Sequence, residues 1–573
     1  MKMQYEKEYR EWCEKATADG DLIKELRSVE GNEEEISDRF YTDLEFGTAG
    51  LRGVIGAGTN RMNVYTVGKA TQGLASYVSS VKSGASAAIS YDSRHKSELF
   101  AKVTASIFAA NGIKVYMYSE LMPTPMLSYA VRYYGCEAGV MITASHNPAK
   151  YNGYKVYGSD GCQLGVEASD RVLKIIESLD IFSDIKTVDF DEAVGKGMIE
   201  FIPQSVIESY LDCVEKQAVC PGVCKGSGFS VIYSPLHGAG NKPVRAILKR
   251  IGLDDVTVVP EQELPDGDFP TVPFPNPEFR EAFTRAAELA KTKPADLLLA
   301  TDPDCDRVGI AVPNGTDHTL FTGNQVGAML LNYILSVKTE KGTLEKDPVA
   351  VKTIVTTDMC LPIAQKYGCR MINVLTGFKY IGEQIALLEQ KGEESRYQLG
   401  FEESYGYLKG SYVRDKDAVV ASMLICEMAC YYKRKGKSLI DVYADLEKEF
   451  GVYHNSQSSF YFEGQNGMAL MADMMRSLAE KPPIAIGGLT VTRVGNYSTS
   501  EMVTVATGEK EKIDLPKASV LYFDLGNGNS VIVRPSGTEP KIKIYTTATA
   551  PTREKADSAA EKIEADLKKI MGI

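Results

Sequence analysis

Three stretches of this 573-residue chain repeat one pattern, in which an apolar, strand-like run breaks off into a short polar loop. The loops are "TASHNP" at 143–148, "TDPDCDR" at 301–307 and "FEESYG" at 401–406. Each loop closes a round of alternating strand-like and helix-like patterns, which is typical of α/β layers. Because ligands of such sheets bind beyond the carboxyl ends of strands, the pattern predicts three similar α/β domains whose loops face one cleft.

The alternation gives each round its own set of expected elements. Strands are predicted from short, continuous apolar runs. Helices are predicted from apolar residues at helical spacing, often followed by a glycine that ends the helix. The expected strands lie within 85–93, 114–119, 138–145, 229–240, 256–261, 295–307, 350–358, 371–379 and 397–406, and the expected helices are 97–113, 242–253, 278–291, 360–368 and 380–390.

The two ends of the chain differ from these rounds. The first 45 residues are charged and compatible with helix, with no catalytic signature. Near the other end, residues 530–548 read as strand, turn and strand, and a helix follows. These patterns predict a helical N-terminal extension and a smaller C-terminal α+β domain. The apolar positions of the last helix, at helical spacing, are Ala556, Ala560, Ile563, Leu567 and Ile570.

Length and composition limit the possible classes of protein. A chain of 573 residues predicts about four domains. No apolar run reaches the ~18 residues of a membrane span and no signal-peptide core follows the first residue, so we expect a soluble, cytoplasmic protein that does not bind membranes. A net charge of −12 argues against nucleic acid as a partner. Eleven cysteines, an odd number, favour reduced thiols, and no second ligand pair completes a zinc site with Cys220 and Cys224.

The loop "TDPDCDR" has the character of a metal site. Asp302, Asp304 and Asp306 alternate, so on an extended segment their carboxylates would converge from one side, and carboxylate oxygens suit Mg²⁺. A calcium loop of the EF-hand type is excluded, since its sixth and twelfth positions are Arg307 and Pro313. The alternative is an aspartate-rich turn that caps a helix. The adjacent arginine favours a site for a metal and a phosphoryl group.

Two further loops suit a phosphorylated sugar. In "RPSGTEPK", Arg534, Ser536, Gly537 and Thr538 offer a guanidinium, two hydroxyls and flexible amides, which can form an anion site, although a plain hairpin turn would also use Pro and Gly. In "FEESYG", Glu402 and Ser404 lie two apart and would point the same way on an extended segment. Such a pair matches vicinal sugar hydroxyls, but a solvated edge is an equal alternative.

Ser145 is the candidate nucleophile. The chain has no "GxSxG" elbow around it, so acyl transfer is disfavoured, and a capping turn is the simpler alternative. An acidic metal loop and an anion site elsewhere in the chain favour a serine that accepts and donates phosphate. His146, Lys155 and Arg52 are then candidates to orient or neutralise the phosphoryl group.

Five motifs together resemble a known family. "GTAGLRG", "TASHNP", "TDPDCDR", "GFEESYG" and "RPSGTEPK" occur in the order and at the spacing of the α-D-phosphohexomutases, and the resemblance covers nearly the whole chain. "LTGFKYIG" and "SPLHGAG" look most like the long phosphoglucomutases of the glucomutase-2 type, a group that also contains phosphopentomutases. One departure is Ala49, where many relatives have serine.

The resemblance implies a heart-shaped enzyme around a central cleft, with three α/β domains of mixed sheets and a smaller C-terminal α+β domain. The implied domains are 1–205 with the phosphoserine, 206–320 with the metal, 321–455 for the sugar and 456–573 for the phosphate. Ser145 would be the phosphoserine and, with Asp302, Asp304 and Asp306, would contact one Mg²⁺ ion. Arg307, Lys155 and Arg52 would steady the transferred phosphate. The proton carrier would be Lys416 or His146.

The resemblance also implies the substrate and the reaction. The enzyme would interconvert glucose 1-phosphate and glucose 6-phosphate, with glucose 1,6-bisphosphate as intermediate and primer, as a monomer or weak homodimer. Phosphopentomutase or phosphomannomutase activity by the same mechanism stays open. The implied substrate-binding residues are Thr48, Gly377, Phe378, Lys379, Glu402, Ser404, Arg534, Ser536, Gly537 and Thr538.

Two other classes compete with this hypothesis. A haloacid-dehalogenase-like phosphatase would also place Asp-x-Asp after an apolar strand, but its threonine or valine two places after the second aspartate is Asp306 here. Phosphoaspartate at Asp302 would revive that class. An inactive sensor of sugar phosphates is the non-enzyme alternative, and it would bind without turnover.

Overall fold

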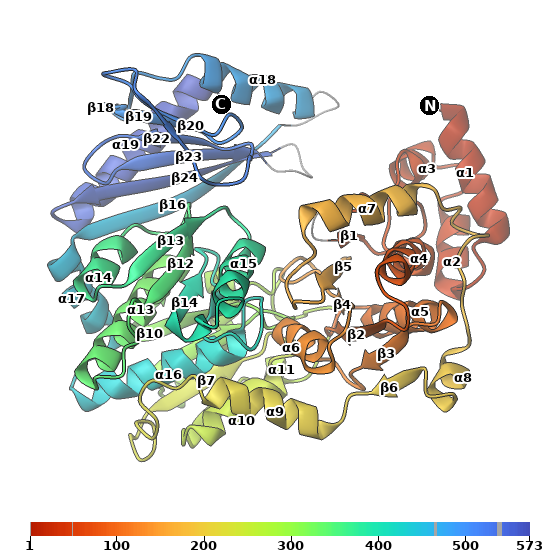
Figure 1. Cartoon of the computed structure of the whole chain (residues 1–573), viewed down its shortest axis with the longest axis horizontal. Coiled ribbons are helices and arrows are strands. Elements are labelled where there is room, and N and C mark those ends of the chain that lie inside the picture. The colour runs from red at the N-terminus through yellow and green to blue at the C-terminus, as the bar shows by residue number, and fades with distance from the viewer. Residues whose placement is uncertain (1, 48–49, 463–466, 536–540, 573) are drawn as a thin grey trace. The chain divides into compact units, whose positions relative to one another are not determined.

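The computed structural model describes residues 2–47, 50–462, 467–535 and 541–572 (Figure 1). The described chain forms two units. The first comprises Met1–Gly323, Ile381–Leu399 and Ser404–Gly436, and the second Asn324–Tyr380, Gly400–Glu403 and Lys437–Ile573.

The first sheet has six strands in the order β1-β5-β4-β2-β3-β6. β2 pairs in parallel with β3 and β4, whereas β5 runs antiparallel to both β4 and β1. The strands are β1 (Gly50–Val54), β2 (Ser86–Tyr91), β3 (Lys114–Met117), β4 (Ala138–Ile142), β5 (Tyr151–Gly158) and β6 (Ile199–Phe201). Its helices are α4 (Val64–Val81), α5 (Ser97–Ala110), α6 (Thr124–Tyr134), α7 (Val166–Glu177) and α8 (Phe190–Gly195).

The second sheet has the order β11-β10-β9-β7-β8, and a third sheet has the order β13-β12-β14-β15. The strands are β7 (Ser230–Ser234), β8 (Asp255–Val258), β9 (Leu297–Thr301), β10 (Val308–Asn314), β11 (Asp317–Phe321), β12 (Val349–Thr353), β13 (Arg370–Val374), β14 (Tyr397–Phe401) and β15 (Tyr407–Leu408). The helices are α9 (Gln204–Glu215), α10 (Asn241–Arg250), α11 (Pro260–Glu263), η1 (Arg280–Phe283), α12 (Thr284–Ala290), α13 (Gly323–Glu340), α14 (Cys360–Lys366), α15 (Phe378–Glu389), η2 (Glu394–Arg396), α16 (Ala418–Arg434) and α17 (Leu439–Phe450).

The three sheets repeat one strand order, which confirms the predicted internal repetition. The order β3-β2-β4-β5 in the first sheet corresponds to β8-β7-β9-β10 in the second and to β13-β12-β14-β15 in the third. β4, β9 and β14 are buried along their whole length, as expected for strands covered on both faces. In each sheet, one of the three polar loops leads from this buried strand to the next strand.

The C-terminal domain is the predicted α+β unit. Its seven-stranded antiparallel sheet has the order β16-β24-β23-β22-β19-β20-β21. The strands are β16 (Val452–Tyr461), β19 (Arg493–Asn496), β20 (Glu501–Thr504), β21 (Lys510–Lys512), β22 (Leu521–Asp524), β23 (Ser530–Pro535) and β24 (Lys541–Ala550), with the pair β17 (Ala485–Ile486) and β18 (Leu489–Thr490) beside them and helices α18 (Gly467–Glu480) and α19 (Arg553–Met571).

The apolar stripe of α19 differs from the prediction at one position. Ala556, Ala560, Ile563 and Leu567 are buried, but Ile570 is 40% exposed and Met571 is buried in its place. Steps of three and of four residues both match the helical period. Residues 570 and 571, which lie three and four positions after Leu567, are therefore both close to the apolar stripe. Met571, four residues after Leu567, belongs to the same apolar core as the strands of the sheet.

The N-terminal extension forms α1 (Lys2–Lys15), α2 (Gly20–Ser28) and α3 (Glu33–Phe40). These helices share one apolar core with the first sheet, and the ring of Trp12 lies 5.7 Å from Phe40, 5.5 Å from Tyr65 and 5.6 Å from Phe182. Glu25 also accepts a hydrogen bond from the amide of Ala57, at 2.8 Å. The extension is therefore part of the first α/β domain and holds the loop that follows β1.

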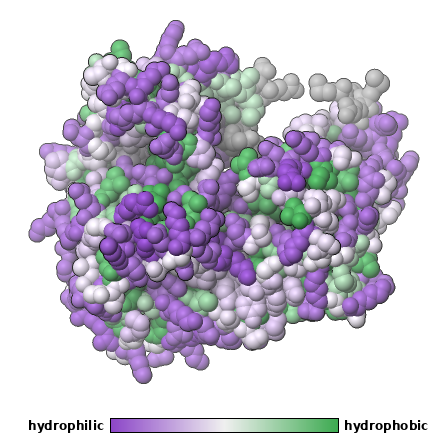
Figure 2. Space-filling view, viewed as in Figure 1, coloured by the Kyte–Doolittle hydropathy of each residue, from purple (hydrophilic) through white to green (hydrophobic). Residues whose placement is uncertain are grey.

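The face of the molecule shown in Figure 2 is mostly polar. On the face shown in Figure 2, hydrophilic side chains predominate and hydrophobic ones form small, separate groups. Among the described helices, none is both long enough and apolar enough to cross a membrane.

The aromatic cluster around Trp12 is expected to stabilise the N-terminal extension. Phe40 is 2% exposed, and its replacement by alanine should lower the free energy of unfolding by about 3–5 kcal/mol, because a large cavity remains beside Trp12. Trp12 is the chain's single tryptophan, so its fluorescence in a urea titration reports this transition. Tyr41→Ala is the matched control, since Tyr41 is 64% exposed and should shift stability by less than about 0.5 kcal/mol. Equal losses in both variants would contradict the packing described here.

Candidate active site

Ser145 lies three residues beyond the end of β4, in a loop held by hydrogen bonds. Its backbone is left-handed, with φ of 52°, and its amide donates to Thr143 Oγ1 at 2.8 Å. The Thr143 hydroxyl in turn donates to Asp92 Oδ2 at 2.6 Å. Only 3% of Ser145 is exposed, so the hydroxyl is presented in a dry and rigid setting.

Arg94 anchors this loop, and the sequence analysis did not single it out. Its guanidinium donates to the carbonyls of Ser145 and Asn147, and to those of Pro148 and Tyr151 at 2.9 and 3.0 Å. Arg94 follows β2, which runs parallel to β4, so the two strand ends meet at the same edge of the sheet. Charged residues directly after a buried strand are the signal that could have identified it.

The loop "TDPDCDR" joins β9 to β10 as a tight turn, and the prediction of an extended segment is wrong. The amide of Cys305 donates to the carbonyl of Asp302 at 2.9 Å, and Cys305 is left-handed with φ of 51°. The amides of Asp306 and Arg307 donate to Asp302 Oδ1 at 3.1 and 3.0 Å. The turn, rather than alternation along a strand, brings the carboxylates together.

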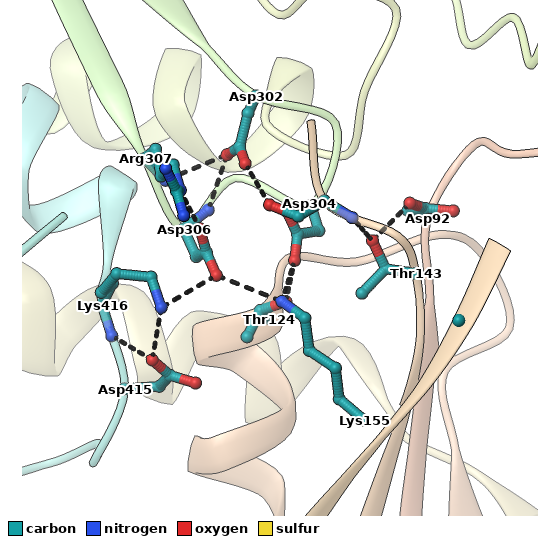
Figure 3. A network of polar contacts seen from close by, with 12 residues as sticks. Asp92, Thr124, Thr143, Lys155, Asp302, Asp304, Asp306, Arg307, Asp415 and Lys416 are labelled. Carbon is teal, nitrogen blue, oxygen red and sulfur yellow. Dashed lines mark hydrogen bonds and ion pairs between the residues drawn. The ribbon is translucent and has the colours of Figure 1, made fainter. Parts of the chain in front are cut away.

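The three aspartates converge, as expected of a metal site. One oxygen of each lies within 4.8 Å of the others, and all three residues are buried. Lys155 Nζ lies 2.7 Å from Asp304 Oδ2 and 3.3 Å from Asp306 Oδ2, and the Thr124 hydroxyl also reaches Asp304 Oδ2, at 2.7 Å (Figure 3). Asp304 Oδ1 and Asp306 Oδ1 are buried without a hydrogen bond. Anchored carboxylates with unsatisfied oxygens fit a hard divalent cation.

Ser145 meets this cluster directly. Its hydroxyl donates to Asp302 Oδ2 at 2.9 Å, and His146 Nδ1 lies 3.2 Å from the same hydroxyl. Burial, together with the positive charges of Arg307 and Arg52, lowers the pKa of His146 well below its usual value. This shift favours the neutral imidazole, which has one ring nitrogen able to accept a proton.

The charges of the cluster depend on one another. Burial and the neighbouring carboxylates raise the pKa of Asp302 well above its usual value. Burial would also raise the pKa of Asp304, but the charge and hydrogen bond of Lys155, together with hydrogen bonds to Thr124 and Asp302, lower it. Burial works against the charge of Lys155, yet the two aspartates it contacts raise its pKa. Lys155 and Asp304 thus keep each other ionised, whereas the surroundings of Asp302 favour its neutral form.

Three further predicted cations surround the loops. Arg307 Nη1 donates to Glu278 Oε1 at 2.8 Å, and Arg52, which is exposed on β1, donates to Asn147 Oδ1 at 3.4 Å. Lys416 Nζ lies 3.2 Å from Asp306 Oδ2. The structure therefore brings Arg52, Lys155, Arg307 and Lys416 to the two loops that carry Ser145 and the aspartates.

The motif "SPLHGAG" packs against the aspartate turn. The amide of Ala239 donates to the carbonyl of Pro303 at 2.8 Å. A Cβ on Gly238 would lie 2.4 Å from the Pro303 Cα, and one on Gly240 would lie 2.9 Å from the Cys305 Sγ. Glycine is required at 238 because the two loops touch there through their backbones, and at 240 because a Cβ would meet the side chains of Tyr233, Thr301 and Cys305.

In the second unit, the predicted sugar-binding residues partly come together. The amide of Gly377 donates to Glu402 Oε1 at 2.9 Å, and Gly377 has φ of 122°. Phe378 is buried at the start of α15, while the Lys379 ammonium lies 5.1 Å from the ring centre of Tyr380. β14 ends at Phe401 and a turn follows, so the prediction that Glu402 and Ser404 share an extended segment is wrong.

The predicted anion loop is only partly described. Arg534 lies near the end of β23, in register with Lys543 on β24. Ser536, Gly537 and Thr538, together with Thr48 and Ala49 of the "GTAG" motif, lie outside the described residues.

Comparisons with known proteins identify the family. Three α/β/α domains and the C-terminal domain of phosphoglucomutase/phosphomannomutase match residues 43–181, 208–315, 322–450 and 500–565. A phosphoglucomutase of Staphylococcus epidermidis is 36% identical over 550 residues, which cover 95% of this chain and 97% of the relative. The chain belongs to the phosphoglucomutase/phosphomannomutase family, whose members are isomerases that transfer a phosphoryl group.

Solved structures share the fold. The Paramecium phosphoprotein pp63/parafusin, a phosphoglucomutase, has a TM-score of 0.67 at 18% identity and covers 93% of this chain and 95% of its own. N-acetylphosphoglucosamine mutase of Aspergillus fumigatus, solved with GlcNAc-6P and magnesium, has a TM-score of 0.52 at 16% identity, over 93% of this chain and 97% of its own.

The close contact between Gly238 and Pro303 allows a test of whether the motif "SPLHGAG" positions the aspartate turn. Gly238→Ala should force Pro303 to move, cost about 1–3 kcal/mol of stability and weaken divalent cation binding. Thermal unfolding with and without MgCl₂ measures both effects. Gly195→Ala is the matched control, because a Cβ there meets nothing within 4 Å. If MgCl₂ stabilises the two variants equally, the contact does not position the turn.

Proposed function

We propose that this protein is a phosphoglucomutase that interconverts glucose 1-phosphate and glucose 6-phosphate through a phosphoserine at Ser145. The observation that carries the proposal is the 2.9 Å contact between the Ser145 hydroxyl and a buried carboxylate of the aspartate turn. A hydroxyl beside a cation-binding cluster can accept a phosphoryl group and return it. The relatives named phosphoglucomutase, at 36% identity over almost the whole chain, support glucose as the sugar.

The cation is proposed to be Mg²⁺, held by Asp302, Asp304 and Asp306 next to the Ser145 oxygen. Three buried carboxylates, two of them with an oxygen that accepts no hydrogen bond, suit a hard cation that prefers oxygen ligands. The solved N-acetylphosphoglucosamine mutase was crystallised with magnesium. When bound, the ion would neutralise charge on the phosphoryl group during transfer.

The proposed transfer requires positioning and a proton acceptor. A sugar hydroxyl attacks phosphorus and loses its proton, the bond between phosphorus and the Ser145 oxygen breaks, that oxygen takes up a proton, and the sugar bisphosphate forms. In the return step, the Ser145 hydroxyl would turn its proton from Asp302 to neutral His146, whose Nδ1 lies 3.2 Å away, and attack the other phosphate. Lys416 is the second candidate for proton transfer, at the sugar. Lys155, Arg307 and Arg52 would balance the negative charge of the phosphoryl group.

One reactive serine can serve both ends of the sugar only if the sugar turns around. Glucose 1,6-bisphosphate is therefore the proposed intermediate and the primer that phosphorylates Ser145. Substrate would be held by residues of two further loops. The proposed sugar contacts are Thr48, Gly377, Phe378, Lys379, Glu402 and Ser404, and the proposed contacts to the non-reacting phosphate are Arg534, Ser536, Gly537 and Thr538.

Ser145→Ala should abolish the formation of glucose 6-phosphate from glucose 1-phosphate, because the variant has no oxygen to carry the phosphoryl group. A coupled assay with MgCl₂ and glucose 1,6-bisphosphate measures the loss. Ser79→Ala is the matched control, since Ser79 is exposed on α4, and it should turn over normally.

Mass spectrometry of the wild-type protein gives a second readout. Phosphate should be found on the peptide that contains Ser145. Near-normal turnover by Ser145→Ala, or phosphate on Asp302 with none on Ser145, would refute the proposal and favour a phosphatase of the haloacid-dehalogenase type.

Substrate choice is tested by comparing glucose 1-phosphate, mannose 1-phosphate, ribose 1-phosphate and deoxyribose 1-phosphate in one assay. We expect glucose 1-phosphate to have the highest kcat/KM, by about tenfold or more, which is roughly 1.4 kcal/mol of transition-state stabilisation. A tenfold preference for a pentose phosphate would make the protein a phosphopentomutase with the same mechanism.

A further inference from the structure

Lys416 bridges the aspartate turn and a second buried acid. Its ammonium lies 3.2 Å from Asp306 Oδ2 and 3.0 Å from Asp415 Oδ1. The side-chain stem passes over Gly406, where an added Cβ would lie only 2.1 Å from the Lys416 Cδ. Lys416 is thus fixed along its stem and at its charged end.

Asp415 is held in turn from the first sheet. The Tyr157 hydroxyl donates to Asp415 Oδ2 at 2.6 Å, and the amide of Lys416 donates to Asp415 Oδ1 at 2.8 Å. Tyr157 lies two residues after Lys155 on β5, so the two side chains leave the strand on the same face. β5 therefore reaches Asp306 twice, directly through Lys155 and indirectly through Tyr157, Asp415 and Lys416.

This second connection acts on the orientation of Asp306. A carboxylate rotates about its Cβ–Cγ bond, and contacts to one oxygen fix the direction of the other. Asp306 Oδ2 receives both lysines, at 3.3 Å from Lys155 and 3.2 Å from Lys416. Among the described residues, Asp306 Oδ1 accepts no hydrogen bond and has only the Arg307 Nε as an ion-pair partner, at 3.8 Å. Loss of a partner that orients a metal-binding carboxylate typically weakens metal affinity by about 10- to 100-fold.

We propose that Tyr157 and Asp415 are positioning residues for the divalent-metal site, because they hold Lys416 against Asp306 Oδ2 and so aim Asp306 Oδ1 at the cation. The inference rests on the proposed function, since it assumes that the aspartate turn binds Mg²⁺. Neither residue belongs to the set of ligands or cations that the motifs pointed to.

Tyr157→Phe is the informative variant because it removes one hydroxyl and no charge. A change in Mg²⁺ affinity in Tyr157→Phe then reports the orientation of the Asp306 carboxylate. Asp415→Asn is less specific because it also changes the electrostatic field at the site. Tyr154→Phe is the matched control. Tyr154 is buried on the same strand, faces the other side and receives a hydrogen bond from the Thr71 hydroxyl at 3.0 Å.

The experiment is a calorimetric titration of the full-length protein with MgCl₂ alone. Tyr157→Phe should weaken Mg²⁺ binding by about tenfold, the low end of the range for partners outside the ligand set, and Asp415→Asn should weaken it at least as much. Tyr154→Phe should stay within about twofold of wild type. In the Lys416→Met background, Tyr157→Phe should have no further effect, since its effect passes through Lys416.

Three results would overturn the inference. One is wild-type affinity in folded Tyr157→Phe and Asp415→Asn, and another is an undiminished Tyr157→Phe effect when Lys416 is already methionine. The third is a wild-type protein that does not bind Mg²⁺, or whose binding survives Asp304→Asn. That last result also refutes the metal site of the proposed function, whereas the first two leave it standing.

Discussion

The crowding of three carboxylates into one buried turn is the constraint on which the rest of the site depends. Burying unpaired negative charge is costly, so the surroundings must supply positive charge and hydrogen-bond donors. Asp302 receives two amides of its own turn, whereas Asp304 and Asp306 receive the ammonium of Lys155. These partners satisfy one oxygen of each carboxylate. The second oxygen of each carboxylate is then available for the proposed cation or for the Ser145 hydroxyl.

The repeated sheet explains how residues 157 positions apart meet. In the first two sheets, a buried strand ends at the edge where its parallel neighbours also end, and the loop that follows carries the polar residues. Ser145 follows β4 and Asp302 follows β9, at equivalent places in two copies of one topology. The repeated strand order therefore places a serine loop and an aspartate loop at equivalent positions, and the hydrogen bond from Ser145 to Asp302 joins them.

The sequence predicted much of the fold because burial leaves a periodic trace. Strand and helix patterns located β4, β9, α5 and α10, and the motif residues Ser145, Lys155 and Asp302 are found together. Loop conformation was predicted less well. The aspartate turn and the "FEESYG" loop were expected to be extended, but left-handed Cys305 and Tyr405 make them turn. Positive φ is not favoured by the residue type at Cys305 or Tyr405, so tertiary contacts impose it there.

The sequence by itself determined the class of the protein. Residue types and their spacing predict the order of the strands, the acidic loop and the serine loop. Only the tertiary structure decided that Arg94 fixes the serine loop, that Tyr157 and Asp415 stand behind Lys416, and which oxygens of Asp304 and Asp306 accept no hydrogen bond. The physical reason is that a buried polar side chain takes its role from its partners. Those partners come from distant segments, and no local pattern records which of them will meet.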